Sequence, residues 1–245
     1  MLVQRDLQRQ YTRFRLGYLW TILEPLGMSM VLWFVFTVLL GTRKLGEQPY
    51  LLFLSIAILP WWWFTRGMAS MTQVFQRSRG QLRISLLPTQ LWVLRVVIVT
   101  MMEFILSLPV IGLAMMLTRT WPGPLILLFP VGIALQFLLM FGLGLLIASW
   151  SVVVPDLARI VRIILRAMFY LSPVLYSINN IPERLQGFAA LNPIVAPLGL
   201  YRVGFWPDEH ESNQWFVVSL AVCAVIIALG LFVFHRLEPR ILKEA

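Results

Sequence analysis

Long apolar runs separated by short basic segments dominate the chain. A helix needs about 20 apolar residues to cross a bilayer core of about 30 Å. Six runs reach or approach that length: Ile22–Leu40, Leu51–Val74, Leu91–Leu117, Leu125–Val154, Ile160–Tyr176 and Trp215–Phe234. The fifth run gives the weakest signal, because Arg162 and Arg166 lie in its first turns. The fourth contains residues that suggest bends: Pro130, Gly132, Gly142 and Gly144. The pattern predicts an all-α integral membrane protein with six transmembrane helices, in a single domain over residues 1–245.

Residues 1–19 precede the first run and form an Arg-rich, half-apolar stretch. As a helix this stretch would gather apolar side chains on one side. Its other side would carry Arg5, Arg9 and Arg13. The pattern predicts a helix that lies on the cytoplasmic membrane surface. The alternative is a plain basic anchor for the positive-inside orientation.

The loop over residues 76–90, between the second and third runs, is basic and contains no acidic residue. Its arginines are Arg77, Arg79 and Arg83, and it ends near Pro88. A short helix with a proline-bounded end would form a rigid protrusion here. We therefore expect a rigid cytoplasmic element, with a simple surface loop as the alternative.

Residues 179–213 follow the fifth run and are too rich in polar residues and proline for another span. They are also too apolar for a solvated loop. Such a backbone is tolerated at membrane depth only when it is buried in protein or lines a cavity. We expect short re-entrant helices on the external side, begun by Pro182 and Pro193, because proline suits a first helical turn.

Composition and charge support a membrane protein and give it an orientation. Hydrophobic residues make up 59% of the chain and charged residues only 13%, whereas a soluble domain carries about 25% charged residues. The net charge of +9 comes from arginines in short loops rather than from a nucleic-acid-binding face. Most of them lie on the side that holds both termini, so the positive-inside rule places both termini in the cytoplasm.

Three ionisable residues fall inside the predicted spans: Glu24, Arg66 and Glu103. A charge at membrane depth is costly and is usually paired or faces water. Arg66 and Glu103 lie at similar distances from the loop that joins their runs, so antiparallel neighbours would bring them together as an ion pair. Glu24 lies near the cytoplasmic mouth, where an arginine of residues 1–19 is within reach.

Enzymatic motifs are missing from the sequence. It contains no G-x-x-x-x-G-K-[ST] phosphate loop, so we expect no ATP site in this chain. The only histidines are His210 and His235. His210 lies in the acidic segment Asp208-Glu209-His210-Glu211, for which we favour a solvated loop over a contact with a divalent cation, and no aspartate lies in an apolar run. We therefore expect no catalytic residues, no bound metal and no cofactor in this chain.

Several short motifs together resemble one family. They are Leu2-Val3-x-Arg5-Asp6-Leu7, Leu16-Gly17-x-Leu19-Trp20 with Pro25-Leu26, Asp156-Leu157, Phe169-Tyr170-Leu171-Ser172-Pro173-Val174-x-Tyr176, Ile181-Pro182-Glu183, Leu191-Asn192-Pro193 and Arg202. In these the chain resembles the membrane subunits of ABC type-2 exporters that move polysaccharides such as O-antigen, capsule, teichoic acid and galactan. The resemblance covers nearly the whole chain.

The resemblance implies a homodimer in the bacterial cytoplasmic membrane that works with two copies of a separate ATP-binding subunit. That subunit would contact the interface helix at Arg5, Arg9 and Arg13. It would also contact residues 76–90, which would then be a coupling loop with Arg77, Arg79 and Arg83. ATP and Mg would bind that partner subunit, and the dimer would form a passage for a lipid-linked polysaccharide. An exporter of drugs or lipids with the same fold is the first alternative. A membrane enzyme that acts on a lipid-linked sugar is the second, and the lack of clustered catalytic residues argues against it.

Aromatic residues are the candidates for the lining of that passage, because their faces stack on sugar rings. The resemblance favours residues of the first and fifth runs, and the triple Trp61-Trp62-Trp63 lies too deep for an interfacial belt. The candidates are Trp33, Phe36, Trp62, Phe169, Tyr170 and Tyr176. For each of them, packing against lipid or within the core remains an equal alternative.

Overall fold

The computed structural model describes residues 19–41, 45–78, 80, 88–207 and 213–244. Within these ranges every regular element is a helix, which confirms the predicted all-α fold. Five helical segments are long and apolar enough to cross a membrane: Ile22–Leu39, Tyr50–Met71, Gln90–Thr118, Pro124–Val153 and Phe216–Ile241. Each corresponds to one of the predicted runs.

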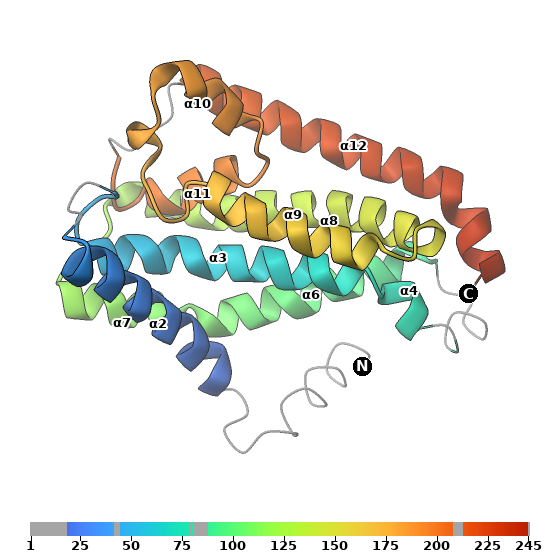
Figure 1. Cartoon of the computed structure of the whole chain (residues 1–245), viewed down its shortest axis with the longest axis horizontal. Coiled ribbons are helices and arrows are strands. Elements are labelled where there is room, and N and C mark those ends of the chain that lie inside the picture. Colours follow the sequence, from blue (N-terminus) through green and yellow to red (C-terminus); the bar gives the residue numbers. More distant parts are fainter. Residues whose placement is uncertain (1–18, 42–44, 79, 81–87, 208–212, 245) are drawn as a thin grey trace.

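Helix α3 (Tyr50–Met71) forms the centre of the molecule. It contacts α2 (Leu19–Trp33), α6 (Gln90–Ser107) and α8 (Phe129–Val153). In Figure 1, α3, α6 and α8 run side by side along the longest axis, while α2 and α12 (Asn213–Glu244) are inclined to them. In α3, 78% of the membrane-spanning segment is buried, whereas only 11% is buried in the segment that contains α2. The core therefore surrounds α3, and α2 lies at the periphery.

Three of the predicted runs differ in detail from the observed helices. The first continues from α2 into a π-helix, η1 (Phe34–Leu39). The third breaks after α6 and resumes as α7 (Pro109–Thr118), because Pro109 has no backbone N–H to continue the hydrogen-bond ladder. The last helix, α12, extends well beyond the predicted end at Phe234.

The glycines of the fourth run provide close packing instead of the expected bends. After a short 3-10 turn, η2 (Pro124–Leu128), α8 is one uninterrupted α-helix. Gly142 lies against the backbone of α12, and a Cβ on Gly230 would overlap the carbonyl group of Gly142. The two helices make their closest approach there, which only glycine permits.

The fifth predicted run forms α9 (Leu157–Leu171), which ends earlier than expected. Its 15 residues give a length of about 22 Å, shorter than a bilayer core of about 30 Å. It ends at Ser172-Pro173, where the backbone turns extended. That α9 crosses the membrane as a sixth span stays a prediction.

Two short helices follow α9 within residues 179–213, and that they are re-entrant and external stays a prediction. After a 3-10 turn, η3 (Ile178–Asn180), come α10 (Glu183–Ala190), which contacts α12, and α11 (Val195–Arg202), which packs against α8 and α3. Pro182 is the residue that precedes α10 rather than a member of its first turn, and Pro193 likewise precedes α11.

The two ends of the molecule carry different elements. Figure 1 shows α10 and α11 towards one end, and the short α4 (Val74–Arg77) and the C-terminus at the other. Residues 1–18 of the predicted interface helix lie outside the described residues, and Leu19 begins α2. The greater part of the predicted coupling loop over residues 76–90 also lies outside them.

Candidate functional site

Three charged side chains from three helices meet on the surface of the helical core. Arg66 of α3 places its Nη2 atom 2.6 Å from Oε2 of Glu24 on α2. Its Nη1 atom lies 3.6 Å from Oε2 of Glu103 on α6. The exposed fractions of the side chains are 36% for Arg66, 55% for Glu24 and 7% for Glu103. The guanidinium therefore bridges a buried carboxylate and a solvent-facing one.

The structure thus brings together the two residues predicted to pair, Arg66 and Glu103. It also shows a partner that the sequence reasoning did not assign. Glu24 binds Arg66, whereas the arginines of residues 1–18 considered as its partners lie outside the described residues. Arg66 therefore links α2 to the core, in addition to the apolar packing of α2 on α3 and α6.

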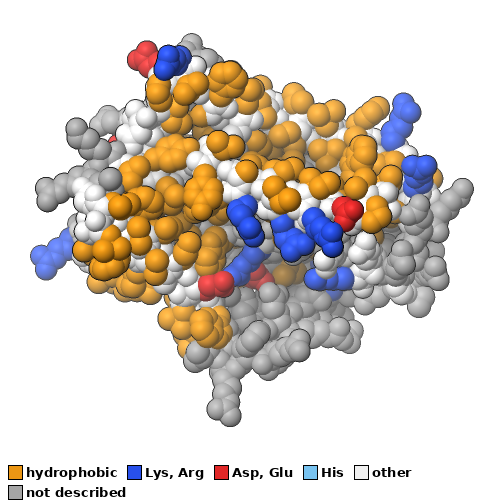
Figure 2. Space-filling view, viewed as in Figure 1, with side chains coloured by type: hydrophobic (Ala, Val, Ile, Leu, Met, Phe, Trp, Pro, Cys, Tyr) orange, Lys and Arg blue, Asp and Glu red, His pale blue; other side chains and the backbone are white. Residues whose placement is uncertain are grey.

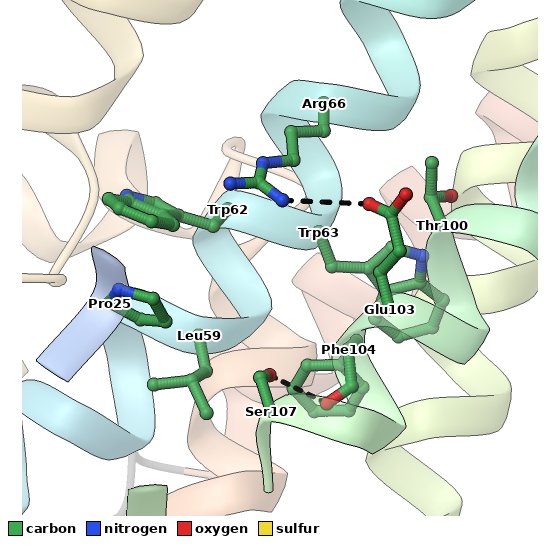
Figure 3. Close-up of a pocket in the computed structure, with 9 residues that line it drawn as sticks. All are labelled: Pro25, Leu59, Trp62, Trp63, Arg66, Thr100, Glu103, Phe104 and Ser107. Atoms are coloured by element: carbon green, nitrogen blue, oxygen red, sulfur yellow. Dashed lines mark hydrogen bonds and ion pairs between the residues drawn. The ribbon is translucent and has the colours of Figure 1, made fainter. Parts of the chain in front are cut away.

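A small, half-open pocket lies beside this cluster (Figure 3). Arg66 and Glu103 supply its charge, and the Arg66 guanidinium lies 5.3 Å from the centre of the Trp62 ring. Trp63 also lines it, and its buried Nε1 has no hydrogen-bond acceptor among the described residues. The full lining is Pro25, Leu59, Trp62, Trp63, Arg66, Thr100, Glu103, Phe104 and Ser107.

The pocket offers sites for polar recognition but no arrangement for catalysis. The hydroxyl groups of Thr100 and Ser107 donate hydrogen bonds to carbonyl groups of their own helix, at 2.9 Å and 2.7 Å. No group of three or more His, Cys, Asp or Glu residues that could hold a metal ion occurs in the described part of the chain. The arrangement is suited to binding and ion pairing.

The tryptophan triple divides between core and surface. Trp61 packs on Phe64 and Phe169, each with ring centres 5.7 Å apart. Trp63 stacks on Phe104 at 5.0 Å with an interplanar angle of 16°. Trp62 alone of the three is half-buried and opens onto the pocket. It is therefore the member of the triple that a passing ligand can reach.

The other aromatic candidates form two groups. Around the C-terminal end of α9, Phe169 meets Tyr170 edge to face at 5.3 Å, and the Tyr176 hydroxyl donates to the Tyr170 carbonyl at 3.2 Å. On α2 and η1, Trp33 is exposed, while Phe36 packs edge to face on Tyr50 at 6.3 Å. Tyr170 and Trp33 are thus the most accessible members of their groups.

Of the six arginines predicted to couple to an ATPase, the structure describes one. Arg77 is exposed at the end of α4. The other five, Arg5, Arg9, Arg13, Arg79 and Arg83, lie outside the described residues.

Sequence reasoning missed the role of Arg202, which is the most buried arginine described. Only 3% of Arg202 is exposed. It donates hydrogen bonds to the carbonyl groups of Pro173 at 2.7 Å and Val174 at 3.1 Å. Its guanidinium lies 3.6 Å from the centre of the Phe53 ring. Arg202 thus fastens the turn after α9 to α11 and α3. An arginine inside the apolar stretch Ile194–Phe205 was the signal that could have revealed it.

A second buried connection runs through Gln136, at the middle of the core. The Tyr201 hydroxyl donates to Oε1 of Gln136 at 3.0 Å, and Nε2 of Gln136 donates to the Pro60 carbonyl at 2.8 Å. This chain ties α11 through α8 to α3. Gln136 is the one amide within its apolar run, and such an isolated polar residue predicts an interhelical hydrogen bond.

Comparison with known proteins identifies the family. The family model for the ABC-2 type transporter matches residues 1–206, and the chain belongs to that family. It is 29% identical to the O-antigen export system permease protein RfbA of Myxococcus xanthus, over 96% of this chain and 90% of the relative. It is 25% identical to RfbA of Klebsiella pneumoniae (98% and 92%) and 21% identical to the polysialic acid transport protein KpsM of Escherichia coli (99% and 94%). These matches confirm the family resemblance seen in the motifs.

Proposed function

We propose that this ABC-2 type transporter chain is the membrane-spanning subunit of an ATP-driven exporter that moves a lipid-linked polysaccharide across the bacterial cytoplasmic membrane. The observation that carries the proposal is the alignment, over nearly the full length, with proteins named for O-antigen export and polysialic acid transport. The helices able to cross a membrane supply the required architecture. Family membership supplies the transporter class, and the names of the relatives supply the class of cargo.

ATP hydrolysis is assigned to a separate subunit, present in two copies. The sequence has no phosphate loop of its own. The end of the molecule that carries α4 and the C-terminus holds exposed arginines, among them Arg77, Arg236 and Arg240. We assign this end to the cytoplasm by the positive-inside rule, and the ATP-binding subunit docks there.

A second copy of the chain completes the passage. Helix α2 is the least covered of the candidate spans and exposes Trp33. Helix α9 exposes arginines and Tyr170 on its outer side. The α9 surface does not suit lipid, because arginine at membrane depth requires water or a charged partner. We therefore assign α9 to the wall of a passage that faces the second subunit, and we add α2 because it is the least covered candidate span.

The decisive experiment is deletion of the gene in its host followed by complementation. The deletion strain should lose surface polysaccharide and accumulate lipid-linked glycan inside the cell, and the wild-type gene should restore export. A strain with normal surface polysaccharide would refute the proposal. Stimulation of the purified complex by small amphiphiles, with no response to glycan, would favour the drug or lipid exporter instead.

The coupling assignment has its own test. Replacement of Arg77, Arg79 and Arg83 by Glu should abolish export or co-purification of the ATP-binding subunit, because the loop would then repel an acidic docking surface. The same change at exposed Arg184, on α10 at the opposite end, is the control. Normal export and normal co-purification in the triple variant would show that the loop is passive.

A further inference from the structure

Helix α9 presents three different faces, a combination unsuited to either water or lipid alone. Val161 and Leu165 are buried against the core. A second face exposes isoleucines, with 70% of Ile163 accessible. The third face carries exposed arginines at positions 159, 162 and 166. At about 100° per residue these arginines fall within a sector of about 60°. Figure 2 shows basic side chains gathered in a row over α9, on a face that is otherwise mostly apolar.

The arginines of this row differ in their partners. Arg159 lies 3.6 Å from Asp156, its neighbour on the first turn. Arg162 donates from Nε to the Ala158 carbonyl of its own helix at 3.2 Å, an interaction that leaves its two Nη groups available. Neither Arg162 nor Arg166 has a carboxylate partner within the described part of the chain. Among the residues that the structure describes, these two guanidinium groups therefore lack a counter-charge.

The position of these α9 arginines indicates what kind of ligand could balance their charge. Because α9 packs against α3 and α8, its arginines border helices that cross the membrane. Unpaired cations beside hydrocarbon are strongly disfavoured, and such residues mark the pathway of an ion or substrate. Guanidinium groups bind phosphate through paired N–H donors, the geometry that arginine provides better than lysine.

We propose that Arg162 and Arg166 bind the phosphate headgroup of the lipid that carries the glycan, while the exposed isoleucines of α9 contact its apolar chain. This inference rests on the proposed export function. The two arginines are four residues apart, an axial spacing of about 6 Å, which one diphosphate can bridge. Ile163 borders the arginine face directly, so one amphiphile meets both faces. Tyr170, one turn beyond Arg166, continues the same face towards the attached sugar.

The faces of α9 favour a lipid headgroup over an acidic sugar. An acidic glycan without a lipid would need the arginines but not the adjacent isoleucines. Bulk anionic lipid offers one phosphate per molecule, whereas the arginine pair fits two neighbouring phosphates. The ligand we assign is therefore a lipid diphosphate with a long apolar chain.

The test measures binding by the full-length chain in nanodiscs of phosphatidylcholine. The probes are a long-chain polyprenyl diphosphate and the matching uncharged polyprenol. We expect the double variant Arg162→Gln, Arg166→Gln to bind the diphosphate at least tenfold more weakly than wild type and the polyprenol equally well. A Lys pair at these positions should recover part of the affinity. Arg184→Gln with Arg119→Gln, two exposed arginines outside α9, is the matched control and should bind like wild type.

Three outcomes would overturn the inference. One is equal affinity of wild type and the Gln pair for the diphosphate. Another is an equal loss of polyprenol binding in the Gln pair, which would indicate damaged packing. The third is efficient competition by a lipid-free acidic oligosaccharide or by phosphatidylglycerol, which would assign the arginines to a different anion. The assay requires no ATP and no export. A chain that binds the diphosphate as expected, but whose deletion leaves surface polysaccharide intact, would refute the export function and not the anion site.

Discussion

Arg66 and Arg202 both place a guanidinium among apolar helices, but their surroundings differ. Arg202 is almost fully buried, donates to two backbone carbonyl groups and lies over the ring of Phe53. Arg66 is about one-third exposed and pairs with two carboxylates on different helices. One arginine is held by the backbone of a turn, and the other by side chains that can move apart.

The difference separates a static connection from one that can change. The carbonyl groups around Arg202 belong to the turn after α9, and they cannot leave without unfolding that turn. Glu24, by contrast, lies on α2, the least covered of the long helices. Arg66 can therefore release Glu24 and keep Glu103 while the core stays intact. We expect α2 to be the element that moves during transport and α11 to stay fixed to α3.

The largest effect should come from Arg202→Met. The variant leaves two buried carbonyl acceptors without a donor, each worth about 1–3 kcal/mol, and the melting temperature of the purified protein should fall steeply. The melting temperature of Arg202→Lys should lie between those of wild type and Arg202→Met, because lysine keeps the positive charge but lacks the planar guanidinium group. Arg184→Met, on an exposed face of α10, is the control. An unchanged melting temperature in Arg202→Met would show that the turn is held by other contacts.

Arg66→Ala should be the next most destabilising. Loss of one partner of a buried pair costs about 3–5 kcal/mol, and the partial exposure of Arg66 reduces this to about 2–3. Glu103→Ala should also cost less than about 3–5 kcal/mol, because the Arg66 left without Glu103 is partly exposed. The double variant should lose less stability than the sum of the single variants, because neither charge is then left unpaired. Strict additivity of the three melting-temperature shifts would mean that Arg66 and Glu103 do not interact.

Trp62→Leu should have a smaller effect, although Trp62 lies between two core tryptophans. Its ring is half-buried, and the cation–π contact with Arg66 contributes about 0.5–1 kcal/mol. We expect a fall of a few degrees in melting temperature, together with a clear loss of export if the pocket touches the cargo. Trp121→Leu, at an exposed position, provides the comparison. A loss of stability as large as that of Arg66→Ala would place Trp62 in the core.

Glu24→Gln should change stability least. An exposed ion pair contributes about 0.2–1 kcal/mol, so the melting temperature should stay nearly constant. The distance distribution between spin labels at Val31 on α2 and Met102 on α6, both exposed, should nevertheless broaden. Glu183→Gln on α10 should leave that distribution as it is. A distribution equally narrow in wild type and Glu24→Gln would show that other contacts hold α2.

The positions of the helices were largely predictable from hydropathy, since a run of apolar residues has few alternatives to a spanning helix. Their ends were less so. The break at Pro109 follows from a residue visible in the sequence, whereas the early end of α9 depends on the turn that Arg202 holds. The glycines of α8 also misled, because glycine permits both a bend and a close approach. Only the neighbouring helix decides between them.

The site was predictable where two charges of opposite sign lay at matching depths. Arg66 and Glu103 are the only ionisable residues in their helices at that level, so their pairing followed from antiparallel packing. Glu24 belongs to a helix with several possible neighbours, and no pattern chose among them. The bonds of Arg202 were hidden for a different reason: backbone carbonyl groups leave no trace in a sequence.

The contact between Gly142 and Gly230 has a mechanical consequence. Two helices whose backbones touch at one point, with no side chains between them, can tilt about that point but can hardly slide or separate. The crossing of α8 and α12 therefore acts as a pivot within each subunit. If α12 tilts about this point, a movement of its C-terminal end shifts the end that contacts α10 in the opposite direction. Helix α12 can therefore act as a lever.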